Sequence, residues 1–228
     1  MHLAEIWRYP VKSMAGERLP RVDIGHLGLL GDRVVHVEDS RGRVITARTH
    51  PGLLGHHAIL GPDGEPLVDG APWSSERPRR AVEEIAGPGA RLVRDDSAER
   101  FDILPLLVAT DGAIAAFGYG GRRLRPNLVI GGVEGLEERT WEGRCLRIGD
   151  VLIGIEDLRG RCVMTTFDPD TLEQDRNVLR SIVRRFDGKL ALNAFVSRGG
   201  TVQEGDRVEL LSAPACRDLR SALPSPAS

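Results

Sequence analysis

A cysteine beside an arginine is the residue pair in this chain that is best suited to chemistry. Cys162 follows Arg161 in the segment Gly-Arg-Cys-Val-Met-Thr-Thr-Phe-Asp-Pro-Asp, residues 160–170. A neighbouring positive charge favours the thiolate, the form of cysteine that binds metals and attacks electrophiles. In the alternative interpretation, Cys162 is the first residue of a buried strand and packs as a small hydrophobe, as free cysteines commonly do.

The other two cysteines give no sign of a metal site or of a disulfide framework. Cys145 and Cys216 belong to no Cys-x-x-Cys motif, so we expect neither a disulfide framework nor a structural zinc site. The alternating polarity of residues 144–148 predicts a half-buried strand around Cys145. The histidines are scattered, and the adjacent His56 and His57 would point to opposite faces of a strand, which suits one metal poorly.

The composition is that of a globular protein with nearly balanced charge. The 228 residues are 41% hydrophobic and 28% charged, with a formal net charge of -2. There is no basic excess, so we expect no nucleic-acid partner, and any anion site must be local. The chain start lacks a signal-peptide pattern, and no apolar run approaches the ~20 residues that span a bilayer. We therefore expect no membrane partner and a cytoplasmic location.

Several short motifs, taken together, point to one family. Arg-Cys followed by Thr-Thr and Asp-Pro-Asp-Thr resembles the MOSC family. Four further segments match the same family in the same order, at residues 9–13 (Tyr-Pro-Val-Lys-Ser), 28–33 (Gly-Leu-Leu-Gly-Asp-Arg), 125–130 (Arg-Pro-Asn-Leu-Val-Ile) and 148–150 (Ile-Gly-Asp). The resemblance extends over about residues 1–212. Within the family, the chain is similar to the group that contains the mitochondrial amidoxime reducing component and the C-terminal part of molybdenum cofactor sulfurase.

This resemblance implies a fold and a cofactor. The implied fold is mainly β with a few helices, a MOSC β-barrel preceded by an N-terminal β subdomain. The implied cofactor is the molybdenum cofactor, a pterin dithiolene with a terminal phosphate, and Cys162 matches its metal ligand. A soft thiolate suits a metal already held by sulfur, and Arg161 would offset part of the charge of the sulfur donors.

The same resemblance assigns the remaining cofactor contacts to distant segments. The matching positions are Lys12, Ser13, Arg33, Arg125 and Asn127 and, by a weaker similarity, Thr46, Arg48, Thr110 and Asp111. In such a site arginine contacts an anion in a bidentate manner and lysine acts as a point charge. Asp111 is the candidate for a catalytic proton donor or polar group near the metal. We expect Arg125→Ala to lose much of the cofactor and to leave the fold intact.

Each of these contacts also has a structural interpretation. Asp32 and Arg33 can form an ion pair at a strand edge, Lys12 can be a solvated turn residue, and Asn127 can be a buried strand residue that bonds to the backbone. The run Arg122-Arg123 is typical of a solvated surface, whereas Arg125 leads directly into an apolar strand.

Gly and Pro divide the chain into short strands, which favours a barrel or sandwich over βαβ units. We expect an N-terminal β subdomain at residues 1–85, a MOSC domain at 86–212 and a disordered tail at 213–228. The expected elements are a hairpin formed by residues 34–38 and 44–48, an exposed connection at 71–80, a short helix at 81–86, a strand at 104–109, a helix at 112–117 capped by Thr110-Asp111, a hairpin across Gly149-Asp150 and an amphipathic helix at 175–186.

Three functional hypotheses follow. The first is a molybdenum-dependent reductase of small N-hydroxylated compounds that receives electrons from a separate flavin or iron–sulfur protein, because we expect neither a ferredoxin-like nor a pyridoxal-phosphate domain in this chain. The second is a carrier that holds the cofactor for another enzyme. The third is a sulfur carrier in which Cys162 bears a persulfide and no metal.

Overall fold

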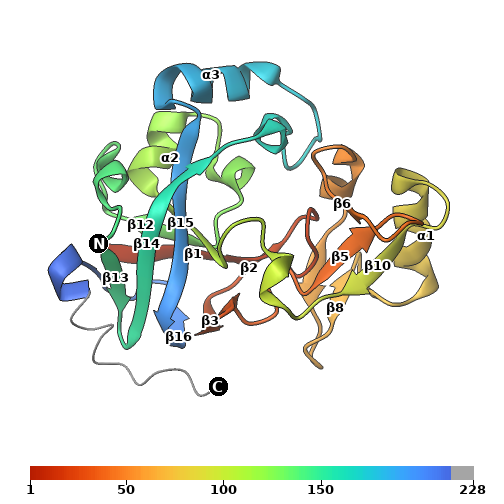
Figure 1. Cartoon of the computed structure of the whole chain (residues 1–228), viewed down its shortest axis with the longest axis horizontal. Coiled ribbons are helices and arrows are strands. Elements are labelled where there is room, and N and C mark those ends of the chain that lie inside the picture. The colour runs from red at the N-terminus through yellow and green to blue at the C-terminus, as the bar shows by residue number, and fades with distance from the viewer. Residues whose placement is uncertain (217–228) are drawn as a thin grey trace.

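The computed structural model describes residues 1–216 and shows a mainly β fold with a few helices, which confirms the predicted class. The largest unit is a curled sheet of eight strands (Figure 1). In spatial order these are β17 (Val208–Leu211), β13 (Cys145–Ile148), β14 (Val151–Gly160), β15 (Lys189–Arg198), β11 (Leu106–Thr110), β12 (Leu128–Gly131), β1 (His2–Arg8) and β2 (Glu17–Arg18). Neighbouring strands are antiparallel except β11 and β12.

Three small sheets complete the β structure. One contains β10 (Arg91–Arg94), β5 (Val35–Glu38) and β6 (Val44–Ile45); another contains β7 (Ala58–Leu60), β8 (Pro66–Val68) and β9 (Ala71–Pro72); the third contains β16 (Gly200–Gln203), β3 (Arg21–Gly25) and β4 (Gly28–Leu29). The first two share a core that includes Val35, Val37 and Leu53. Figure 1 shows them with α1 at the end of the molecule far from β13.

Strand pairing crosses the boundary that we expect near residue 85. The N-terminal strand β1 pairs with β12 in the large sheet, whereas β10, which follows that boundary, pairs with β5. The two parts of the chain are therefore interleaved, and segments from both can contribute to one site.

The helices are few, and a side chain caps the start of two of them. They are α1 (Glu76–Ala86), α2 (Asp111–Phe117) and α3 (Arg176–Phe186), with short 3₁₀ turns η1 (Pro51–Gly55), η2 (Ala98–Arg100), η3 (Gly121–Leu124), η4 (Glu137–Thr140) and η5 (Val163–Thr166). The side chain of Thr110 accepts a hydrogen bond from the Ala113 N–H, and that of Asp175 accepts one from Asn177, so both act as N-caps. The helices predicted at 112–117 and 175–186 are confirmed.

The helix predicted at residues 81–86 is longer than expected. It begins at Glu76 and so includes half of the segment that we expect to be an exposed connection. Pro78 lies in the first turn, where backbone N–H groups have no partner within the helix, and proline is tolerated there.

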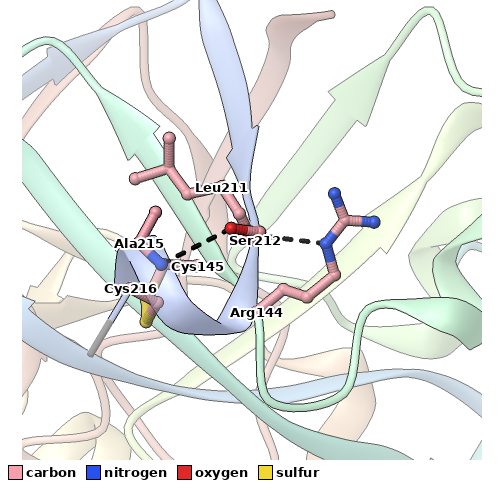
Figure 2. The surroundings of a disulfide bond; sticks show 6 residues. All are labelled: Arg144, Cys145, Leu211, Ser212, Ala215 and Cys216. Carbon is pink, nitrogen blue, oxygen red and sulfur yellow. Dashed lines mark hydrogen bonds between the residues drawn. A yellow bond between two sulfur atoms is a disulfide. The ribbon is translucent and has the colours of Figure 1, made fainter. Parts of the chain in front are cut away.

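Cys145 and Cys216 form a disulfide bond, although the sequence gives no sign of a disulfide framework (Figure 2). Both side chains are buried, and they join β13 to a chain segment 71 residues later. Residues 213–216 have helical backbone, and the N–H of Cys216 donates to the Ser212 carbonyl at 2.9 Å. The disordered tail expected from residue 213 is therefore ordered up to residue 216, and residues 217–228 lie outside the described part of the chain.

Within residues 1–216, no helix combines the length and the apolar character needed to cross a membrane.

The disulfide is expected to stabilise the fold, because it closes a loop of 71 residues and restricts the unfolded chain. The chain-entropy model gives about 4 kcal/mol for a loop of this size. Thermal unfolding with and without a thiol reductant tests this expectation. The melting temperature of the wild type should fall on reduction, whereas the double variant Cys145→Ala, Cys216→Ser should melt at one temperature in both conditions. A wild type that is insensitive to reductant would contradict the pairing.

Candidate anion-binding site

A cavity of about 350 Å³ lies where the interleaved parts of the chain meet. Its lining residues come from six separate segments and include Lys12, Ser13, Arg33, Thr46, Arg48, Asp102, Ile103, Leu107, Arg123, Leu124, Arg125, Arg159, Gly160, Arg161, Cys162 and Met164. The structure thus brings together Lys12, Ser13, Arg33 and Arg125, which lie far apart in the sequence, with the cysteine.

The charge of this cavity is strongly positive. It is lined by one lysine and six arginines but by a single carboxylate, that of Asp102. The chain as a whole has a formal net charge of -2, so the positive charge is concentrated locally. Clefts lined by charge of one sign attract ligands of the opposite sign. The cavity is suited to an anion that carries several hydrogen-bond acceptors.

Three of the lining residues have unusual backbone conformations. Ser13, Arg33 and Arg125 have φ angles of 72°, 54° and 55°, in the left-handed region that non-glycine residues seldom adopt. Such a conformation costs on the order of 1–3 kcal/mol and is found most often at functional sites. At Ser13, the hydroxyl accepts a hydrogen bond from the Ala47 N–H at 3.0 Å, which holds this turn in place.

The ring of Tyr9 supports two of the arginines. The guanidinium of Arg125 lies 4.2 Å from its centroid and that of Arg33 lies 5.3 Å away. Arg125 also donates to the Met14 carbonyl at 2.7 Å. Burial raises the pKa of Tyr9 to about 12 and lowers the pKa of Arg125 to about 10. Tyr9 therefore stays neutral and Arg125 stays charged at physiological pH.

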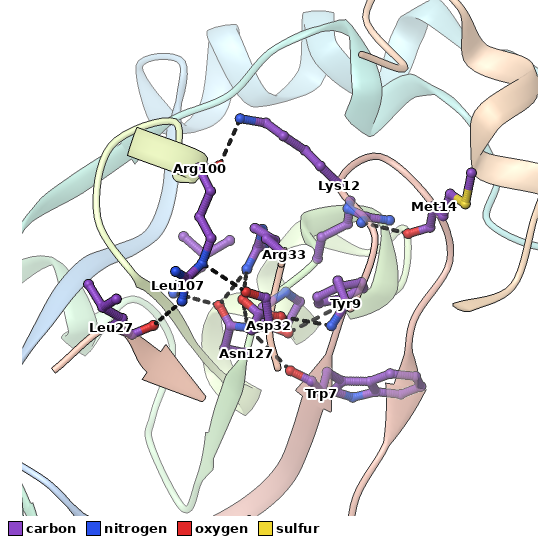
Figure 3. A network of polar contacts seen from close by, with 12 residues as sticks. Trp7, Tyr9, Lys12, Met14, Leu27, Asp32, Arg33, Arg100, Leu107 and Asn127 are labelled. Carbon is purple, nitrogen blue, oxygen red and sulfur yellow. Dashed lines mark hydrogen bonds and ion pairs between the residues drawn. The ribbon is translucent and has the colours of Figure 1, made fainter. Parts of the chain in front are cut away.

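The buried carboxylate of Asp32 forms an ion pair with Arg33 (Figure 3). Asp32 is fully buried, and it accepts hydrogen bonds from the Tyr9 N–H at 2.8 Å and from the Asn127 side-chain amide at 3.2 Å, besides its ion pair with Arg33. The amide oxygen of Asn127 accepts from the Leu107 N–H and from Arg33. Both structural interpretations apply here: Asp32 and Arg33 form an ion pair, and Asn127 bonds to the backbone behind the cavity.

Asp102 lies among three of the cations. Its carboxylate is 2.9 Å from Lys12, 2.6 Å from Arg48 and 3.5 Å from Arg159. Burial acts to raise the pKa of Asp102, but the hydrogen bond and charge of Lys12 and the charges of the two arginines hold it below its ordinary value. Asp102 is therefore ionised at neutral pH and fixes the positions of the three cationic groups. Lys12 is not the solvated turn residue of the alternative interpretation.

Cys162 precedes the turn η5 and does not begin a strand, so the strand interpretation is wrong. Its carbonyl accepts hydrogen bonds from the N–H and the hydroxyl of Thr165. Its thiol is half-buried and forms no disulfide bond. Beside it, burial lowers the pKa of Arg161 to about 10. Arg161 donates to the Leu124 carbonyl at 2.7 Å, while its buried Nε has no partner among the described residues.

Thr110 and Asp111 do not belong to this site. The Thr110 hydroxyl donates to the buried Glu138 at 2.8 Å. The Asp111 carboxylate accepts N–H groups from Gly112, Gly132 and Val133, at 2.7–3.0 Å. Neither side chain lines the cavity, so the candidate proton donor Asp111 serves to hold a turn.

Three charged residues of the cavity lie outside the sequence motifs. Arg123 is only 11% exposed and binds Asp168, although its position in a run of arginines predicts a surface residue. Arg159 precedes Cys162 by three residues, and its place in Arg-Gly-Arg-Cys is a signal that could have identified it. Asp102 lies in an irregular segment without any pattern. Within residues 1–216, no cluster of three or more His, Cys, Asp or Glu side chains is arranged to hold a metal.

Comparison with known proteins agrees with the motifs. Residues 1–68 match the MOSC N-terminal beta barrel domain, and residues 118–209 match the MOSC domain. The chain belongs to the MOSC family. This MOSC protein is 26% identical over 232 residues to mitochondrial amidoxime reducing component 2 of Homo sapiens, an alignment covering 76% of the chain and 69% of that relative. It is 25% identical to mitochondrial amidoxime-reducing component 1 of Homo sapiens, covering 92% of the chain and 82% of the relative.

Two further similarities are more limited. The MOSC protein is 36% identical to molybdenum cofactor sulfurase of Bombyx mori over 84 residues, which are 37% of the chain and 10% of that relative. The crystal structure of the YUAD protein from Bacillus subtilis resembles it with a TM-score of 0.51 at 13% identity, over 92% of this chain and 95% of that one. At this identity the resemblance shows the fold alone.

Substitution of Arg125 by alanine is expected to weaken anion binding about tenfold, since a charged hydrogen bond contributes about 1.5–3 kcal/mol. The variant should also lose about 1–2 kcal/mol of stability, because the Tyr9 ring is uncovered and the Met14 carbonyl loses its donor. This revises the expectation that the fold is unaffected. Calorimetric titration with pyrophosphate and thermal melting measure the two effects. Arg122→Ala, at an exposed arginine paired with Asp170, is the control; equal pyrophosphate affinity in both variants would contradict the assignment.

Proposed function

We propose that the cavity binds the molybdenum cofactor, with Cys162 as a ligand of the metal, and that the protein reduces N-hydroxylated compounds with electrons from a separate protein. The observation that carries this proposal is the clustering of one lysine and six arginines around the single free cysteine of the described chain. Phosphate and pterin are rich in hydrogen-bond acceptors, and a thiolate is a suitable donor to a metal that is also held by dithiolene sulfur.

The residues present fit such a group. The unpartnered Nε of Arg161 is a buried donor next to the cysteine, and an anionic ligand there would satisfy it. Arg33 and Arg125 are held by Tyr9 in fixed orientations, so they would bind the anion with little loss of side-chain freedom. When bound, the cofactor would supply the two-electron redox chemistry.

The protein side chains have separate roles in this proposal. Lys12, Arg33 and Arg125 would hold the terminal phosphate, and Arg159 and Arg161 would balance the negative charge near the sulfur donors. The apolar side chains of Ile103, Leu107 and Met164 would exclude water from the cavity. Asp102 would keep Lys12 and Arg48 in position at the rim.

The names of the relatives support the reductase. The chain matches most of the length of two amidoxime reducing components but only a small part of a molybdenum cofactor sulfurase. One observation favours the alternative of a cofactor carrier. The cavity, at about 350 Å³, lies at the small end of the ~300–1,000 Å³ typical of ligand pockets, so a bound cofactor leaves little room for a substrate.

Protein purified from a host that makes the cofactor tests the proposal. We expect equal molar amounts of molybdenum and of pterin, with the pterin measured by its fluorescence after oxidation. We also expect the protein to reduce benzamidoxime with dithionite as the source of electrons. Molybdenum and pterin without turnover would instead support the carrier. Sulfane sulfur on Cys162 in the absence of molybdenum would support the persulfide carrier and contradict the proposed cofactor.

A further inference from the structure

A second hollow lies on the other side of the turn that follows Cys162. This hollow, the α3 groove, measures about 540 Å³ and is lined by Val163, Thr166, Arg176, Leu179, Arg180, Val183 and Arg184. It shares no lining residue with the anion-binding cavity. Val163 and Thr166 belong to η5, so the two sites lie on either side of one turn.

The charge of the α3 groove comes from arginines without ionic partners. Arg176, Arg180 and Arg184 are spaced four residues apart, which places them along one face of the helix. All three are exposed, and within residues 1–216 none forms an ion pair; Arg180 bonds only to the Asn177 side chain, at 3.3 Å. Three uncompensated guanidinium groups on one face attract an acidic surface.

The floor between these arginines is apolar. Val183 is 57% exposed, although it is a large aliphatic residue, and Leu179 and Val163 are only half-buried. An apolar centre with an arginine rim is typical of a protein interface, because arginine is enriched and lysine depleted there. The groove is therefore suited to a protein surface that presents apolar residues surrounded by carboxylates.

Hydrogen bonds connect the α3 groove to the cysteine. The Thr166 hydroxyl donates to the Val163 carbonyl at 2.7 Å, and the Thr166 carbonyl accepts from the Asp175 N–H at 2.8 Å, at the start of α3. In the same turn, the Thr165 hydroxyl donates to the Cys162 carbonyl at 2.9 Å. A protein seated on α3 would thus contact the turn that begins at the cysteine.

We propose that the α3 groove is the docking site of an acidic electron-transfer protein that reduces the metal held by Cys162; this inference rests on the proposed function. Conversion of an amidoxime to an amidine takes up two electrons and two protons, breaks the N–O bond and releases one water. The reduced iron–sulfur or flavin group of the docked protein supplies the electrons, and solvent supplies the protons.

Charge reversal tests the docking site, with a plant-type ferredoxin and a flavodoxin as acidic probes. The double variant Arg180→Glu, Arg184→Glu is compared with Arg41→Glu, Arg77→Glu, which makes the same change of charge at exposed arginines outside the groove. We expect calorimetric affinity for at least one probe, and benzamidoxime turnover driven by that probe, to fall about tenfold or more in the α3 variant only. Higher salt should weaken binding to the wild type.

Two measurements separate this inference from the proposed function. Molybdenum content and dithionite-driven turnover should be unchanged in both double variants, because neither touches the cavity. Equal probe affinity in the two double variants, or no salt-sensitive binding of either probe to the wild type, would overturn the docking site. Absence of dithionite-driven turnover in the wild type would overturn the reductase, while calorimetry would still decide whether the groove binds an acidic protein.

Discussion

The candidate site depends on one buried carboxylate. Asp32 has no exposed surface, and it binds the Tyr9 backbone, the Asn127 amide and the Arg33 guanidinium. These groups lie next to the end of β1, in the Gly-Asp-Arg turn and next to the start of β12, so a single side chain joins three segments beside the cavity. A buried charge is costly to leave unpaired, and removal of one partner from such a pair commonly destabilises a protein by about 3–5 kcal/mol. The network therefore fixes Arg33 in a left-handed backbone conformation that it would otherwise seldom adopt.

This arrangement explains how so many cations can share a small cavity. Five of the seven have a carboxylate partner that limits repulsion: Asp32 for Arg33, Asp102 for Lys12, Arg48 and Arg159, and Asp168 for Arg123. Arg125 and Arg161 instead bond to backbone carbonyls, and burial lowers the pKa of each to about 10. Because neither arginine has a carboxylate partner, a bound anion would offset the cost of burying their charges more than for the other cations. One of the two, Arg161, is adjacent to Cys162.

The sequence predicts what local patterns determine. Helical periodicity predicts α3, and turn residues predict the hairpin of β13 and β14, both of which the structure confirms. Motif resemblance predicts Lys12, Ser13, Arg33 and Arg125, and all four line the cavity. The residues that motif resemblance misses depend on contacts between segments far apart in the sequence. Arg123 is held inward by its ion pair with Asp168, and Cys145 is brought near Cys216 by the pairing of β13 with β17. The prediction for Asp111 is wrong because an acidic residue at the start of a helix can equally well accept hydrogen bonds from a neighbouring turn.

The central claim is that the cations hold the cofactor and that the Cys162 thiolate holds its metal. It is tested most directly by the molybdenum and pterin contents of Cys162→Ser, purified alongside the wild type. A serine hydroxyl is a hard, protonated donor, so we expect molybdenum per protein to fall by about tenfold or more, while pterin stays partly bound through the cationic cavity and the apo-protein melts at the wild-type temperature. A Cys162→Ser variant that retains its full molybdenum content would contradict the account.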